Sequence, residues 1–170
     1  MAVIRHAVGV LLLALAACAA SVAASAQTCD CKFPDDERLG IRTISAIYEA
    51  VPILAETHNG DEVEPGQAAI RGELEVITFR IEGIWQGAPV KTLRVLNRPS
   101  NCAVGFHLNQ KALIALFPIM PAEIRAITVL RDLKVAWATH YCLVDFVNQV
   151  QRKGRLGEYL GRAAAAPVDP

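Results

Sequence analysis

The alternation of apolar and polar residues predicts a series of short β-strands in the middle of the chain. The clearest covers residues 73–85, where Phe79 and Ile81 alternate with polar neighbours. Leu74 and Val76 lie on the opposite phase of that segment, which predicts a β-bulge or a coiled strand. The other predicted strands cover residues 53–57, 91–96, 112–117, 127–130 and 135–138.

Two short helices flank the predicted strands. The first begins at Pro34 and ends before Pro52, and its apolar face consists of Ile41, Ile44, Ile47 and Tyr48. The second has its apolar face on Leu143, Phe146, Val147 and Val150. Closing short strands into a small antiparallel barrel leaves few exposed edges, so we expect a mostly β fold with flanking helices.

The first residues of the chain predict export. Residues 7–17 form an apolar run that is too short for a membrane-spanning helix but typical of a signal core. Ala24-Ser25-Ala26 fits ordinary cleavage, which would remove a signal peptide of residues 1–26. Leu15-Ala16-Ala17-Cys18 also resembles a bacterial lipobox. Cleavage there would remove residues 1–17 and leave Cys18 lipidated and anchored to a membrane. Both processing routes stay open.

The rest of the chain is predicted to form one domain. Residues 27–150 are long enough for a real core, and residues 151–170 are expected to form a helix end and a disordered tail. The charges balance, with 17 Lys and Arg against 17 Asp and Glu, and the basic residues are scattered. Binding of nucleic acid requires clustered Lys and Arg, so it is disfavoured. No later apolar run is long enough to span a membrane.

Four cysteines remain once Cys18 is set aside, and an even number in an exported chain indicates a disulfide framework. They are Cys29, Cys31, Cys102 and Cys142. A bond between Cys29 and Cys31 would close a strained ring, so each of them needs a distant partner. Two pairings satisfy that condition. A structural zinc site is the alternative, although such sites prefer Cys-x2-Cys pairs.

Four short motifs along the chain resemble the netrin-like domain of the tissue inhibitors of metalloproteinases. Cys29-Asp30-Cys31 resembles its Cys-x-Cys start, and the segment 84–87 resembles its aromatic-Lys-Gly turn, with Gln86 in place of Lys. The segment 101–106 is similar to its Cys-Gly-x-x-Phe stretch with the glycine displaced, and the segment 139–142 resembles its Thr-x-x-Cys end. The resemblance implies a five-stranded OB-fold barrel, stapled by Cys29–Cys102 and Cys31–Cys142.

The resemblance also implies a protein partner, which in that family is a metalloprotease. The first cysteine of those inhibitors is the mature N-terminus, and its free amine holds the catalytic zinc. Here Gln27 and Thr28 precede Cys29, so its nitrogen would be an amide. We therefore expect an exported, non-catalytic protein-binding module rather than a zinc-chelating inhibitor. The candidates for its binding edge are Cys29, Asp30, Ile119 and Met120.

Nothing in the sequence indicates catalysis. The chain contains neither Gly-x-Ser-x-Gly nor His-Glu-x-x-His, so we assign no catalytic residue, metal or cofactor. Two alternatives to the protein-binding module remain. One is a lipid-anchored structural protein of the cell envelope. The other is a small-ligand or metal binder that uses His107 and His140, which lie near Cys102 and Cys142 in the sequence.

Overall fold

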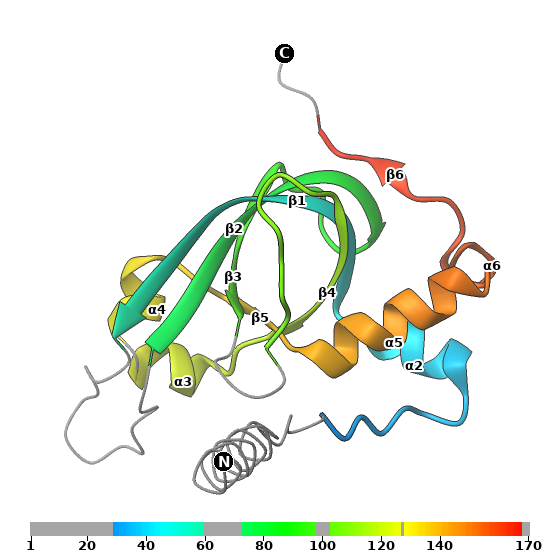
Figure 1. Ribbon diagram of the computed structural model, residues 1–170, viewed down its shortest axis with the longest axis horizontal. Helices are drawn as coiled ribbons and strands as arrows, with labels where there is room; N and C mark the ends of the chain where they lie inside the picture. The colour runs from blue at the N-terminus through cyan, green and yellow to red at the C-terminus, as the bar shows by residue number, and fades with distance from the viewer. Residues whose placement is uncertain (1–28, 60–72, 98–102, 127, 168–170) are drawn as a thin grey trace, which may run out of the picture.

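The computed structural model describes residues 29–59, 73–97, 103–126 and 128–167, arranged as Figure 1 shows. Residues 29–36 form an irregular segment, called here the N-terminal strip, which leads into the short helix α2 (Glu37–Thr43). Asp36 caps this helix because its carboxylate accepts a hydrogen bond of 3.0 Å from the amide of Leu39. The first half of the predicted N-terminal helix is therefore present.

The second half of that helix prediction is wrong, because Ile47 and Tyr48 lie in strand β1 (Ala46–Asn59). Tyr48 points into the barrel, whereas Ile47 packs outward against the helical layer. Burial on both faces makes the apolar spacing of a strand resemble that of a helix. Pro52 lies inside β1 beside a register shift, and a shift of this kind is where a strand tolerates proline.

Five strands close into a barrel. β1 is joined by β2 (Glu73–Gln86), β3 (Thr92–Asn97), β4 (Ala112–Pro118) and β5 (Trp137–Thr139). The neighbours around the barrel are β1, β2, β3, β5 and β4, with β4 returning to β1, and only β3 and β5 run parallel. A five-stranded barrel of this kind is an OB fold, so the predicted fold class is confirmed.

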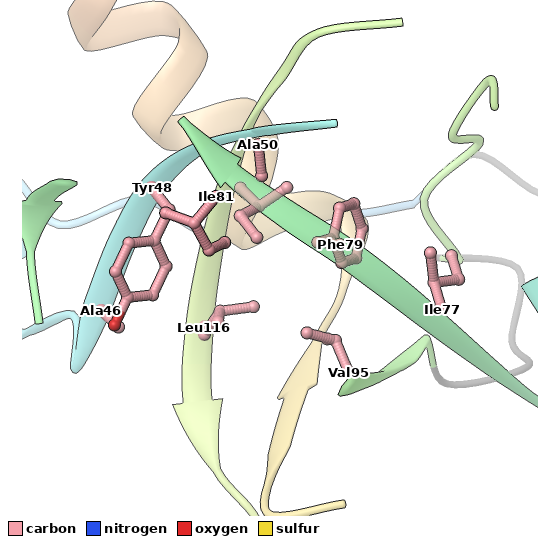
Figure 2. Close-up of a cluster of buried hydrophobic side chains, with 9 residues drawn as sticks. Ala46, Tyr48, Ala50, Ile77, Phe79, Ile81, Val95 and Leu116 are labelled. Carbon is pink, nitrogen blue, oxygen red and sulfur yellow. The ribbon is translucent and has the colours of Figure 1, made fainter. Parts of the chain in front are cut away.

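The interior of the barrel is filled by apolar side chains that range in size from alanine to phenylalanine and tyrosine. Tyr48 and Phe79 are the largest of them, and Phe106 packs edge-on against Phe79 with ring centroids 5.1 Å apart. Figure 2 shows the cluster, whose labelled members are Ala46, Tyr48, Ala50, Ile77, Phe79, Ile81, Val95 and Leu116. Because apolar side chains fill the interior of the barrel, we expect a binding site on the outer surface of the molecule.

A second apolar cluster lies outside the barrel. The predicted strand at 127–130 is wrong for residues 128–130, because they lie in the helix α4 (Thr128–Asp132), which follows α3 (Pro121–Ala126); residue 127 lies outside the described residues. Leu74 and Val76 pack on the outer face of β2 in one cluster with Leu130. Their opposite phase in the sequence therefore reflects a covered outer face. The register shifts between β1 and β2 lie elsewhere along the ribbon.

The C-terminal part of the chain packs against the opposite side of the barrel. The predicted helix is confirmed as α5 (Tyr141–Arg152), and α6 (Leu156–Leu160) follows it. Within the tail that is predicted to be disordered, β6 (Ala164–Ala165) pairs with β2 at Gly83 and Ile84, and residues 168–170 lie outside the described residues. The helices in the described part of the chain are all too short or too polar to cross a membrane.

Side-chain hydrogen bonds hold the turn at the end of β2 against the start of β1. The side chain of Gln86 donates a hydrogen bond to the carbonyl of Ile44, and the Tyr48 hydroxyl donates one of 3.0 Å to the carbonyl of Ala88. Gly87 has φ = 117°, and a Cβ there would lie 2.5 Å from the Tyr48 oxygen. The segment that resembles the aromatic-Lys-Gly turn thus stabilises the fold.

Candidate binding site

A disulfide joins the N-terminal strip to the first turn of α5. It links Cys31 to Cys142, with Cα atoms 5.3 Å apart and a sequence separation of 111 residues. This bond is one of the two that the resemblance implies. Cys29 is also disulfide-bonded. Its predicted partner Cys102, like the lipidation candidate Cys18, lies outside the described residues.

The sulfur atoms of this region form a small cluster. Cys29 Sγ lies 3.8 Å from Cys142 Sγ, and the three sulfurs of Cys29, Cys31 and Cys142 lie within 4.8 Å of one another. It is the one group of three or more potential metal ligands in the described ranges. A metal would need thiolates, and Cys31 and Cys142 use their sulfurs to bond each other. In this form the cluster acts as a covalent staple.

Aromatic packing holds the rest of the N-terminal strip in place. Phe33 stacks on Phe146 of α5, with ring centroids 5.4 Å apart and an interplanar angle of 21°. Pro34 packs against α2 at Gly40. A Cβ on Gly40 would lie 2.8 Å from Pro34 Cγ and 2.9 Å from Phe146 Cζ, so only glycine allows this approach. The strip is therefore fixed at two adjacent points by side-chain contacts and at a third by the disulfide.

An open cavity of about 300 Å³ lies between the N-terminal strip, the end of α2, the end of β4 and the start of α5. Its apolar walls include Phe33, Ile44, Phe117, Leu143 and Phe146. The polar groups around it are few, and they come from Lys32, Thr43, Ser45 and His140. A concave, mainly apolar surface with a few polar groups at its margin is typical of binding sites.

The structure separates the predicted residues of the binding edge. Asp30 is exposed beside the disulfide, and Met120 is 68 % exposed at the start of α3. Ile119 is only 3 % exposed, packs in the cluster beneath α3 and α4, and donates its amide to the Ala136 carbonyl at 3.0 Å. Ile119 is thus a core residue, and its prediction as a contact residue is wrong. An apolar residue in a turn between two prolines can face inward as easily as outward.

His107 and His140 occupy different environments. His107 is exposed in the turn before β4, where its carbonyl accepts a hydrogen bond from the amide of Gln110 at 3.1 Å. His140 is half-buried, contributes to the cavity, and lies with its ring centroid 5.6 Å from that of Phe117. Neither histidine belongs to a cluster of three potential metal ligands in the described part of the chain.

Most residues of the cavity wall were not predicted from the sequence. Phe33, Phe117 and Leu143 come from three different elements, and each is an ordinary core residue in its local context. The one available signal was the position of Phe33, an aromatic residue placed between Cys31 and Pro34 in a segment that must follow the disulfide onto the barrel.

The comparisons with known proteins add no relative to these observations. No protein-family model matches the chain, and no curated protein matches its sequence. The netrin-like resemblance therefore stays a prediction, and the function has to be inferred from the residues and their geometry.

Proposed function

We propose that this chain is an exported, non-catalytic protein-binding module, and that the cavity beside the Cys31–Cys142 disulfide takes up a large apolar side chain of its partner. The observation that carries the proposal is the cavity itself, with about 300 Å³ of space between the N-terminal strip and α5. Its volume lies at the low end of the range for ligand pockets, which suits one or two anchoring side chains better than a large cofactor.

The surroundings of the cavity also suit a protein partner. A rigid receptor loses little conformational freedom on binding, and the disulfide and the Phe33–Phe146 stack hold the N-terminal strip before a partner arrives. Asp30 and Lys32 are exposed next to the cavity and supply charges of both signs. Interfaces commonly combine an apolar centre with a polar rim of this kind.

Filling the cavity tests the proposal. Ser45 is exposed and contributes to the margin of the cavity, so Ser45→Trp should occupy the space without disturbing the core. Peptides selected from a random library on the immobilised mature protein should carry a large apolar residue. We expect Ser45→Trp to weaken their binding about tenfold or more by calorimetry.

The matched control introduces the same side chain elsewhere. Thr92 is exposed at the start of β3 and does not contribute to the cavity, so Thr92→Trp should bind the peptides like the unmodified protein. Equal binding by both tryptophan variants, or a selection without any binder, would exclude the cavity as the recognition site.

The mature N-terminus decides how closely the function follows that of the metalloproteinase inhibitors. We expect the intact mass of protein from its native host to correspond to a start at Gln27, or at Cys18 with attached lipid. With either start the nitrogen of Cys29 is an amide, so we expect no stoichiometric titration of zinc endopeptidases. A mass that starts at Cys29 and a linear titration would contradict this expectation and assign the zinc-chelating mechanism.

A further inference from the structure

Among the described residues, the second half of strand β1 has no neighbouring strand along one of its two edges, called here the open edge. β1 pairs with β2 along almost its whole length, from Ile47 to Asn59, but it pairs with β4 only from Ala46 to Ala50. Beyond Ala50, one backbone hydrogen bond joins this edge of β1 to another described segment. The Asn109 amide donates it to the Pro52 carbonyl, at 2.8 Å. In Figure 1 this half of β1, with its arrowhead, runs beside β2 at the left of the barrel.

The open edge carries little of the usual protection against pairing beyond Ile53. Proteins generally guard open edges with lysine, proline, bulges or very short strands. Pro52 and the adjacent register shift mark the beginning of the edge, but residues 53–59 contain neither Lys nor Pro. Ile53 and Leu54 are 40 % and 46 % exposed, and Leu108, next to the residue that bonds Pro52, is 52 % exposed. The edge is therefore suited to receive another strand.

The order of Glu56 and His58 along the edge suits pairing with a second copy of the same strand. If two β1 strands pair antiparallel with Thr57 at the centre, Glu56 of each copy lies opposite His58 of the other. A centre at Glu56 would instead place two carboxylates opposite each other, which is unfavourable. Thr57 is exposed, so its side chain does not obstruct the centre of the pair.

The same two residues contain polar atoms without partners. Glu56 Oε2 and His58 Nε2 are shielded from solvent, and neither has a hydrogen-bond partner among the described residues. Shielded polar atoms of this kind are rare in folded proteins and require an explanation. Both side chains would have to turn outward to reach a second β1 strand, whose His58 and Glu56 would then supply a partner for each.

We propose that two copies of this chain associate through the open edge of β1, as antiparallel strands centred on Thr57. The two barrels then share one continuous sheet, and the contact is self-complementary about a two-fold axis, as in most homodimers. The open edge belongs to β1, and no residue of β1 lines the cavity, so the dimer would leave both cavities accessible.

Exchanging Glu56 and His58 tests the pairing. We expect sedimentation equilibrium of the mature protein to show a monomer–dimer equilibrium. His58→Glu places carboxylates opposite each other in two symmetric pairs and should weaken association about tenfold or more. Adding Glu56→His to that variant restores opposite pairs with an unchanged composition and should recover most of the affinity, while circular dichroism checks that each variant is folded. A protein that stays monomeric over roughly three decades of concentration, or a double variant no tighter than His58→Glu, would overturn the proposal.

A crosslink at the two-fold axis tests the register. Residues directly opposite in an antiparallel pair have Cα atoms about 4.5–5.5 Å apart, a distance that a disulfide can bridge. Thr57→Cys should therefore form a covalent dimer under mild oxidation. In the same register the two copies of position 55 lie about 13 Å apart along the strands, so Ala55→Cys should not crosslink. Equal crosslinking by both variants would contradict the register, and the dimer with it.

Discussion

Removing the Cys31–Cys142 disulfide is expected to lower the free energy of unfolding by about 4 kcal/mol. The bond spans 111 residues, and a crosslink over so long a loop strongly restricts the unfolded chain. The double variant Cys31→Ser/Cys142→Ser removes the bond without leaving an unpaired thiol. Equilibrium unfolding in urea should show a lower midpoint and a larger dependence on denaturant, because the released unfolded chain exposes more surface.

A variant that leaves the sulfurs alone separates this effect from packing. Phe33→Ala removes the stack on Phe146 but keeps the crosslink, so it should lower stability by about 1–2 kcal/mol without changing the denaturant dependence. A loss below about 1.5 kcal/mol for the double serine variant would show that the bond does little for stability. The double variant should also lose peptide binding, since the N-terminal strip forms one wall of the cavity.

Most strands of the barrel could be predicted from the sequence, because the spacing of apolar residues in each strand reflects which of its faces are buried. β2, β3 and β4 were predicted at nearly their observed positions, since alternation or a short apolar run follows directly from which faces are buried. β1 was divided wrongly because its two faces are covered by different layers. The segment of α4 was predicted as a strand, because five residues are too few for a helical period to show.

The candidate site was harder to predict because it depends on contacts between distant segments. Cys31 and Cys142 indicated a staple, but the cavity beside them depends on Phe33 reaching Phe146 and on Gly40 allowing that approach. The local spacing of apolar residues contains no information about contacts between segments so far apart in the sequence. Ile119 shows the converse case, because a residue that looked exposed in a turn is buried by helices that the sequence did not predict.

Replacing Asn97 is expected to destabilise the fold strongly, because its side chain is buried and fully hydrogen-bonded. Asn97 ends β3 and is only 1 % exposed. Its amide donates to the Val104 carbonyl at 2.9 Å and to Glu75, and its oxygen accepts from the Val104 amide at 3.1 Å. Asn97→Leu leaves these groups unpaired in a shielded place and should cost about 3 kcal/mol in urea unfolding. Asn148→Leu is the control: it removes a single bond within α5, and we expect a loss below about 0.5 kcal/mol.

Asn97→Asp separates hydrogen bonding from packing, because it keeps the shape of the side chain and the acceptor for the Val104 amide. The other aspartate oxygen would face the Val104 carbonyl and the Glu75 carboxylate, so the folded protein would favour the protonated form of the new carboxyl group. That group would have a raised pKa in the folded state. Between the pKa of this aspartate in the unfolded chain, about 3.9, and its raised pKa in the folded protein, the folded state binds more protons than the unfolded state. The stability of the variant relative to the unmodified protein therefore falls as the pH rises through this window. Unfolding of both proteins at pH 4 and pH 7 should therefore show the larger loss at pH 7. An equal loss at both values would mean that Asn97 acts through its shape alone.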